Sequence, residues 1–206
     1  MKDYTAQKNM ERLLQSLDGR VPRLLLHSCC GPCSSYVLEY LSEYFDIALF
    51  FYNPNIHPKE EYQKRLITQK KLLEKAVYKH GVTFLEGEYD PERFFETVKG
   101  LENEKEGGKR CQKCFELRLK EAAKEASNGN FDFFATTLTV SPHKDALIIN
   151  RIGSEFENYL PSDFKKREGY KRSIILSKQY DLYRQDYCGC VFSKNQRDRE
   201  IALKNQ

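Results

Sequence analysis

Apolar residues in this chain fall into short runs that alternate with longer amphipathic stretches. Runs of this kind predict strands of a parallel sheet, because such strands are covered on both faces and are apolar along their length. They place strands at residues 23–27, 46–51, 82–85 and 131–136. Helical spacing of apolar residues predicts helices at residues 4–18, 33–44, 58–80, 91–98, 111–126, 141–152 and, as the last helix, 170–178. The alternation predicts a parallel α/β sheet.

Turn-forming residues separate these elements and place the expected binding edge. Pro58 suits the first turn of its helix, and Ser141-Pro142 suits an N-cap and first turn. Ligands of open α/β sheets bind outside the carboxyl ends of the strands, at the switch point. The loops at that edge are residues 28–33, 52–57 and 136–143.

The size of the chain predicts one domain that spans residues 1–206, with residues 153–206 as a C-terminal extension. A chain of 206 residues buries a core without crosslinks. The charged segment Met1–Arg20 has no apolar signal region, and no apolar stretch has membrane-spanning length. A cytoplasmic protein without a membrane partner is therefore expected.

The net charge of +4 is too small to imply a nucleic-acid partner by itself, but basic residues crowd one stretch of the extension. The basic patch consists of Lys165, Lys166, Arg167, Lys171 and Arg172. Only Asp163 and Glu168 oppose it nearby, so it suits phosphate groups. On charge alone, a solvated surface is the simpler interpretation.

The seven cysteines lie in three tight groups rather than scattered through the apolar runs. The groups are Cys29, Cys30 and Cys33; Cys111 and Cys114; and Cys188 and Cys190. The first group follows the first strand directly, at the expected binding edge. Cysteines used for packing would be scattered, and an odd count argues against a closed set of structural disulfides. The grouping indicates thiol chemistry.

The first two groups together have the ligands for one metal centre. Cys111 and Cys114 can chelate from the start of a helix, and a pair from the first group completes four thiolates. Four thiolates fit tetrahedral zinc or an iron–sulfur cluster. The adjacent pair Cys29-Cys30 is awkward for a single zinc ion, and it reaches different irons of a larger cluster more easily. The spacing favours iron–sulfur over zinc.

The third group, Cys188-Gly189-Cys190, has a different spacing. A disulfide across one intervening residue closes a small strained ring, and strained disulfides are easily reduced and redox-active. Further metal ligands, or two inert buried thiols, are the alternatives.

Two of the histidines and their neighbours are candidates for acid–base work. His27 lies in a strand and is expected to be a near-core residue with satisfied nitrogens rather than a ligand. His57 and His143 lie at the binding edge, where either can be an acid or a ligand, although lone histidines are more often neither. Lys144 and Asp145 share the edge with His143 and suit phosphate contact and proton supply.

Five segments together resemble the cobalamin-independent epoxyqueuosine reductases, the QueH family. They are His27-Ser28-Cys29-Cys30-Gly31-Pro32-Cys33, Phe51-Tyr52-Asn53-Pro54-Asn55-Ile56-His57-Pro58, the pair Cys111 and Cys114, Thr137-Leu138-Thr139-Val140-Ser141-Pro142-His143-Lys144, and Tyr187-Cys188-Gly189-Cys190. The resemblance covers almost the whole chain and is specific as a combination.

The resemblance implies a fold, a reaction and site roles. The fold would be a Rossmann-like sheet similar to adenine-nucleotide alpha-hydrolases, with cysteines in place of the phosphate loop and a helical C-terminal extension. The reaction would be two-electron removal of the epoxide oxygen of epoxyqueuosine at the tRNA wobble position, with an electron donor of unknown identity. Cys29, Cys30, Cys111 and Cys114 match the ligands of a [4Fe–4S] cluster, Cys188 and Cys190 match a redox-active pair, and Cys33 is a candidate ligand of an additional mononuclear iron.

This resemblance leaves the proton donor unnamed, so His57, His143 and Asp145 are all candidates. It also raises the prospect that the basic patch, with Lys144, binds tRNA phosphates. Two other classes of function compete. A nucleotide-using tRNA-modification enzyme would need a glycine-serine phosphate loop after the first strand, which this chain does not have there. A zinc-stabilised RNA-binding module would be colourless and without turnover.

Overall fold

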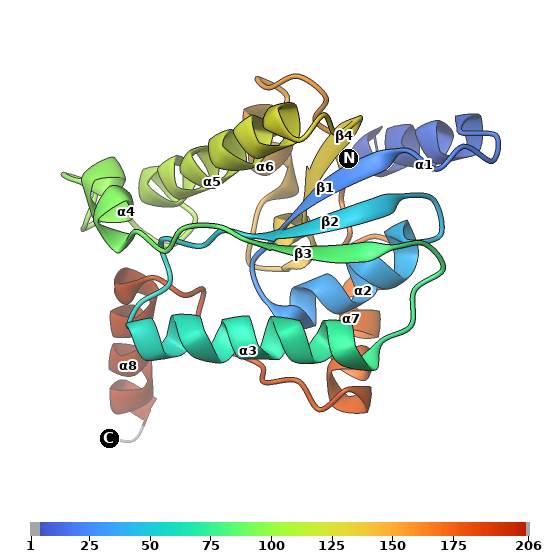
Figure 1. Cartoon of the computed structure of the whole chain (residues 1–206). Coiled ribbons are helices and arrows are strands. Elements are labelled where there is room, and N and C mark those ends of the chain that lie inside the picture. The colour runs from blue at the N-terminus through green and yellow to red at the C-terminus, as the bar shows by residue number, and fades with distance from the viewer. Residues whose placement is uncertain (1–4, 205–206) are drawn as a thin grey trace.

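A computed structural model describes residues 5–204 of the chain and shows a four-stranded parallel sheet with helices on both faces (Figure 1). The strand order is β3-β2-β1-β4, with every neighbouring pair parallel. The strands are β1 (Arg23–Ser28), β2 (Asp46–Phe51), β3 (Val82–Glu86) and β4 (Phe133–Thr136). All four lie within two residues of the positions that the apolar runs predict, so the predicted fold class is confirmed.

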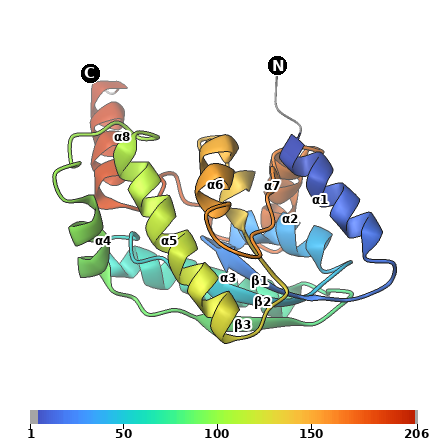
Figure 2. The ribbon, with the colours of Figure 1, turned by 90° about the horizontal axis from the view of Figure 1, so that it is seen from above.

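Helices connect the strands and cover the sheet. They are α1 (Thr5–Ser16), α2 (Gly31–Leu41), α3 (Lys59–Lys75), α4 (Pro91–Val98), α5 (Lys109–Asn128), the 3-10 helix η1 (Thr137–Val140), α6 (Ala146–Gly153), α7 (Gly169–Gln179) and α8 (Val191–Lys204). In Figure 1, α5 and α6 lie above the sheet, and α2, α3 and α7 lie below it. The view from above shows α5 crossing over the strands (Figure 2). None of these helices, over residues 5–204, is long and apolar enough to cross a bilayer.

Alternate residues of the strands build two separate cores. In β1, Leu24 and Leu26 pack with α1 and α2, whereas Leu25 packs against α5 and α6. All three leucines are fully buried. Because both faces are covered, the strand has no polar alternation, as the apolar run predicts. Burial of such side chains from both sides fixes the register of the sheet.

Strand β1 lies at the point where the chain changes direction across the sheet. The chain passes from β1 outward through β2 to β3 and then returns to β4, on the other side of β1. The carboxyl ends of β1 and β4 therefore border the crevice in which such folds bind ligands. Cys29 follows β1 there, and η1 follows β4.

Several helix boundaries differ from the predicted ones. Helix α6 begins after its N-cap Asp145, whose carboxylate accepts a hydrogen bond from Leu147 N, so the expected Ser141-Pro142 cap is wrong. Helix α3 ends at Lys75, and helix α7 is not the last one, because α8 follows it. The first residue of the first predicted helix, Tyr4, lies outside the described residues.

Candidate functional site

The turn from β1 into α2 brings three thiols together. The Sγ atoms of Cys29, Cys30 and Cys33 all lie within 4.8 Å of one another, and those of Cys29 and Cys30 are 3.8 Å apart. Cys30 is the N-cap of α2 in extended conformation, and Pro32 occupies the first helical turn as its missing N–H allows. Three thiols at this spacing can bind one metal centre.

Gly31 is required at this turn because α2 packs tightly against α3. A Cβ atom at Gly31 would lie 3.0 Å from both the Cγ2 atom and the carbonyl oxygen of Thr68. Gly31 falls within the predicted loop at residues 28–33, but in the structure it is the first residue of α2. The glycine therefore brings the thiol group close to α3.

The three thiols do not ionise alike. Hydrogen bonds from Cys30 and Cys33 hold the pKa of Cys29 well below its usual range. The same sharing of hydrogens with Cys29 raises the pKa of Cys30 to about 11. It also raises the pKa of Cys33, and burial adds to that rise. Cys29 is the first of the three to become a thiolate, the form that binds metals.

A cavity of about 560 Å³ opens in front of these thiols. Its wall includes Cys29 and Cys33, the segment Val140–Lys144 after β4, Cys188, and residues of α7 and α8. Four residues of α8 line it at helical spacing, namely Ser193, Gln196, Arg197 and Glu200. The cavity is large enough for one nucleoside-sized ligand. It lies at the predicted edge of the sheet, and α8, which the sequence analysis missed, forms part of it.

The second thiol pair lies on α5. Cys114 is buried, and burial raises its pKa to about 12, whereas Cys111 is half-buried and accepts a hydrogen bond of 3.2 Å from Gly107 N. Cys111 packs against the same apolar core as Cys29 and Cys30. Neither sulfur joins Cys29, Cys30 and Cys33 in a group within 4.8 Å among the described residues. In the structure the first group is a triad, and the α5 pair lies apart from it.

The third pair lies on the segment that connects α7 with α8. Cys188 lines the large cavity and also a small one that it shares with Cys111. Cys190 is buried beside Cys114 and Leu117 of α5, and its Sγ atom lies 3.5 Å from Ser193 Oγ. Cys188 thus faces both other thiol groups through cavities. All seven cysteines are free thiols in the structure.

Cationic side chains lie around the thiols, and two of them are not among the predicted site residues. Arg65 and Arg118 are 1% and 2% exposed, and both line the large cavity together with Lys144. Burial alone would lower the pKa of Lys144, but the nearby thiolates, Cys188 foremost, outweigh it and raise that pKa. A charged residue in the apolar stripe of a predicted helix is the signal that could have identified both arginines.

Arg118 connects the first binding-edge loops to the α5 pair. Its Nη2 atom donates to Asn53 Oδ1 at 2.8 Å, and its Nη1 atom lies 4.0 Å from Cys114 Sγ. Asn53 in turn donates from Nδ2 to the carbonyl of Ser28, directly before the cysteine triad. The loop at residues 52–57 therefore acts here by holding Arg118 in place.

The histidines have separate environments. His27 is fully buried, and burial lowers its pKa to about 3, so it is neutral. Its Nε2 atom faces the Tyr52 carbonyl, which only accepts, so Nε2 carries the hydrogen and Nδ1 accepts from Thr136 Oγ1. The prediction of a satisfied core histidine is confirmed. His143 is exposed and lines both cavities, whereas His57 lies against Phe95 and lines neither.

Asp145, the other predicted proton donor, lines the small cavity beside Cys111, and its carboxylate is also the cap of α6. The basic patch, by contrast, is paired throughout. Its ion pairs are Lys165 and Lys166 with Asp163, Arg167 with Glu11, Lys171 with Glu168, and Arg172 with Glu39. Glu11 and Glu39 come from α1 and α2, so the linear sequence did not reveal them as partners. Arg167 and Lys171 are nevertheless 73% exposed.

Comparison with protein families gives a match over most of the chain. A family model described as epoxyqueuosine reductase QueH matches residues 24–196. A protein of that name from Staphylococcus epidermidis is 49% identical over 85% of this chain and 78% of its own length. One from Staphylococcus aureus is 44% identical over 96% of this chain and 89% of its own, and one from Thermotoga maritima is 34% identical over 88% and 96%.

Among solved structures, the fold resembles that of the U34-tRNA thiolase NcsA from Methanococcus maripaludis, determined with its [4Fe-4S] cluster. The TM-score is 0.51 at 15% identity, over 96% of this chain and 73% of the thiolase. At this identity the likeness concerns the fold alone.

Proposed function

The chain belongs to the QueH family of epoxyqueuosine reductases and is an oxidoreductase, and we propose that it reduces its substrate in the cavity lined by Cys29, Cys33 and Cys188. The observation that carries this assignment is the cysteine triad at the switch point of the sheet, open to a cavity that a thiol of the third pair also lines. The family name implies a tRNA substrate, whose modified wobble nucleoside would enter the cavity.

The Cys188–Cys190 pair is proposed as the immediate source of electrons. Oxidation of two thiols to a disulfide releases two electrons and two protons. Removal of the epoxide oxygen takes up two electrons and two protons and leaves an alkene and water. One turnover therefore balances between the dithiol and the epoxide, and an external donor, in vitro a dithiol, then reduces the disulfide.

The thiols and their surroundings suit a [4Fe–4S] cluster. Thiolate ligands make such a centre anionic, and Arg65, Arg118 and Lys144 place three cations beside them. Following the family resemblance, we assign Cys29, Cys30, Cys111 and Cys114 as its ligands. Common packing of Cys111 with Cys29 and Cys30, and the position of Arg118 beside Cys114, support this set. When bound, the cluster would supply one-electron transfer.

Cys33 is left outside this ligand set, although its sulfur lies within 4.8 Å of Cys29 and Cys30. Because Cys33 lines the cavity, we propose it as a ligand of an additional mononuclear iron. A triad of Cys29, Cys30 and Cys33 that binds the cluster by itself is the competing assignment, and measurement of iron in single variants separates the two.

The walls of the cavity suit a nucleotide of an RNA loop. Tyr170 and Tyr187 present aromatic rings, and Arg184 and Arg197 present guanidinium groups. RNA loops are recognised by stacking of splayed bases and by contacts with phosphates. Tyr170 lies in the first turn of helix α7, which also carries Lys171 and Arg172, so the basic patch continues from the cavity along α7. We propose that the patch and Lys144 bind phosphates of the same loop.

His143 is the proposed proton donor, with Asp145 as the alternative. His143 lines both cavities and is exposed, so it can exchange protons with solvent. The Asp145 carboxylate accepts a hydrogen bond of 2.8 Å from Leu147 N as the cap of α6, and this structural role makes it the weaker candidate. His57, which lines neither cavity, has no support from this geometry.

The proposal is tested with protein purified without oxygen. The wild-type protein should contain the four irons and four sulfides of the cluster together with the additional iron, should show iron absorbance, and should convert epoxyqueuosine in tRNA to queuosine. Cys111→Ala should lose the cluster iron and the activity together, whereas Cys33→Ala should lose only the additional iron. A colourless protein with one zinc and no turnover would contradict the proposal and favour the zinc-stabilised RNA-binding module. Full cluster and activity in Cys111→Ala would refute the ligand set.

A further inference from the structure

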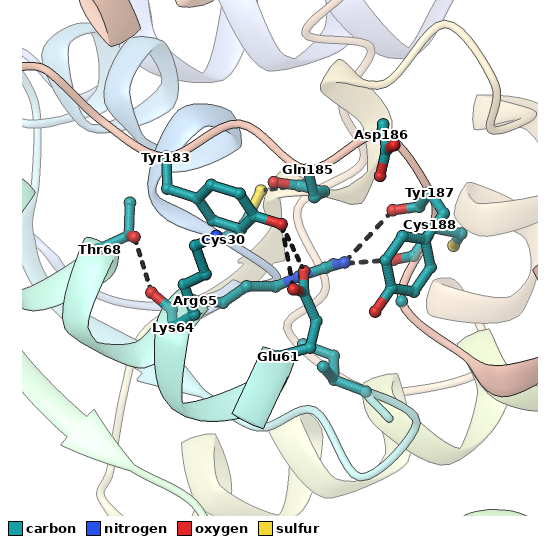
Figure 3. A network of polar contacts seen from close by, with 12 residues as sticks. Cys30, Glu61, Lys64, Arg65, Thr68, Tyr183, Gln185, Asp186, Tyr187 and Cys188 are labelled. Atoms are coloured by element: carbon teal, nitrogen blue, oxygen red, sulfur yellow. Dashed lines mark hydrogen bonds and ion pairs between the residues drawn. The ribbon is translucent and has the colours of Figure 1, made fainter. Parts of the chain in front are cut away.

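The segment at residues 183–190, which includes Cys188, passes across the first turns of α3. Three side chains of that helix hold it there (Figure 3). Lys64 places its ammonium group 3.7 Å from the centre of the Tyr183 ring. Glu61 accepts hydrogen bonds of 3.0 and 3.3 Å from the Tyr183 hydroxyl. The third side chain, Arg65, reaches the segment beside Cys188 itself.

Every nitrogen of the Arg65 guanidinium has a partner. Its Nε atom pairs with Glu61 at 2.6 Å, Nη1 donates to the carbonyl of Cys188 at 3.0 Å, and Nη2 donates to the carbonyl of Tyr187 at 3.3 Å. Arg65 is among the largest fully buried side chains, at 1% exposure. A planar fork fixes the relative orientation of two acceptors, which a lysine cannot do.

A second set of contacts holds the same segment from the binding-edge loop. His57 N donates to the carbonyl of Gly189 at 2.9 Å, and the Tyr187 hydroxyl donates to the His57 carbonyl at 3.1 Å. The carbonyls of Tyr187, Cys188 and Gly189 are thus all bonded to groups outside the segment. Because these peptide planes are fixed, so is the direction in which the Cys188 side chain leaves the backbone.

The segment also contacts the cysteine triad directly. Gln185 Nε2 lies 3.0 Å from Cys30 Sγ, within hydrogen-bond distance. Cys188 and the triad members Cys29 and Cys33 line one cavity. A shift of the segment would therefore move Cys188 relative to both the triad and the bound substrate.

We propose that Arg65 is the positioning residue of the Cys188–Cys190 pair, because it holds Cys188 at the cavity wall through the carbonyls of Tyr187 and Cys188. The proposal rests on the redox role assigned to that pair. Energetic stabilisation is a poor explanation for a buried arginine, because desolvation of a buried ion pair offsets most of its attraction. Orientation of the segment explains why all three nitrogens of the guanidinium are bonded.

The test compares two variants with a matched control. Arg65→Met removes the fork, and Arg65→Lys keeps the charge but not the fork. Arg23 is the control, because its Nη1 atom also donates to two backbone carbonyls, those of Gly129 and Asn130, far from the thiols. Arg23→Met should leave thiol chemistry and turnover unchanged. If Arg65→Met does not fold, Arg65→Lys and Glu61→Gln disturb the same fork with less change in volume.

Two measurements follow for each folded variant. The first is thiol chemistry: the rate of Cys188 alkylation by iodoacetamide, and the dithiol–disulfide equilibrium of the pair in glutathione buffer, both by mass spectrometry. The alkylation rate and the dithiol–disulfide equilibrium constant should each change at least tenfold in Arg65→Met and in Arg65→Lys. The second is turnover of epoxyqueuosine-containing tRNA, in which kcat should fall at least tenfold while KM stays within twofold.

Thiol chemistry and kcat within twofold of wild type in both Arg65 variants would overturn the proposal. Failure of the wild-type protein to reduce epoxyqueuosine would instead refute the proposed function. The two failures are distinguishable because alkylation and the thiol equilibrium need no substrate.

Discussion

Replacement of Gly189 by alanine should displace the segment that carries Cys188. The backbone of Gly189 has a φ of +135°, in the half of conformational space that side chains with a Cβ atom rarely adopt. A Cβ atom there would also lie 3.0 Å from Arg65 Nη1 and 3.2 Å from Ile56 Cγ1. Gly189→Ala therefore combines backbone strain with crowding against the side chain that holds the segment.

The two costs can be separated. Backbone strain at a positive φ costs about 1–3 kcal/mol, and overpacking of a fitted contact costs about 1–3 kcal/mol more. Gly100 provides the control, because its φ is +80° and nothing lies within 4 Å of an added Cβ atom. Gly100→Ala should show only the strain. The unfolding free energy of Gly189→Ala should fall by about 1–3 kcal/mol more than that of Gly100→Ala. Alternatively, local opening of the segment should relieve the strain and crowding at residue 189.

The assay pairs urea unfolding with alkylation of Cys188. Global loss of stability appears as a lower urea midpoint, and local opening appears as faster alkylation with an unchanged midpoint. Either result agrees with the structure. A Gly189→Ala protein that matches Gly100→Ala in midpoint and matches wild type in alkylation would refute the close contact with Arg65.

Three further predictions concern groups around the site. Arg118→Met leaves the buried Asn53 Oδ1 atom without its donor, so the unfolding free energy of the metal-free protein in urea should fall by about 1–3 kcal/mol. The control Lys124→Met, on the same helix but exposed, should change it by less than about 0.5 kcal/mol. Asp145→Ala should lose about 1 kcal/mol because the α6 cap is lost, and Asp145→Asn should retain it; equal losses in calorimetry would refute the cap. Burial raises the pKa of Tyr159, so the unfolded protein loses that proton first and stability falls as pH rises above about 10. Tyr159→Phe should therefore lose less stability than wild type from pH 9 to 11. The same slope of unfolding free energy against pH in both proteins would contradict this.

Strands and most helices could be predicted from the sequence, because both depend on local apolar patterns. The buried run Leu24–Leu26 specifies a central strand wherever it is placed in an α/β fold. Helix α8 was missed because its first apolar residues, Val191 and Phe192, are followed by eight polar ones before Ile201. Such a helix has little amphipathic signal, and its polar face lines a cavity rather than solvent.

At the site, the sequence identifies the candidate reactive atoms but not the groups that hold them. The cysteines are visible because their chemistry is rare and their spacing tight. Arg65, Arg118 and Gln185 are common residues whose roles come from contacts with residues more than 60 positions away, such as those with Cys188, Asn53 and Cys30. The same limit applies to the basic patch, whose partners Glu11 and Glu39 become neighbours only after folding.

The sheet order has a consequence for how the two thiol groups fluctuate. Residues Leu24–His27 of β1 are paired with β2 on one side and β4 on the other, so amide hydrogens there should exchange with solvent only on global unfolding. Cys29 and Cys30 are tethered to that strand. The segment at residues 183–190 lies outside the sheet, held largely by side chains of α3, and belongs to the part of the molecule that opens at lower cost. Local opening of the segment would let the Cys188–Cys190 pair, in its proposed redox role, reach a reductant while the triad keeps its geometry.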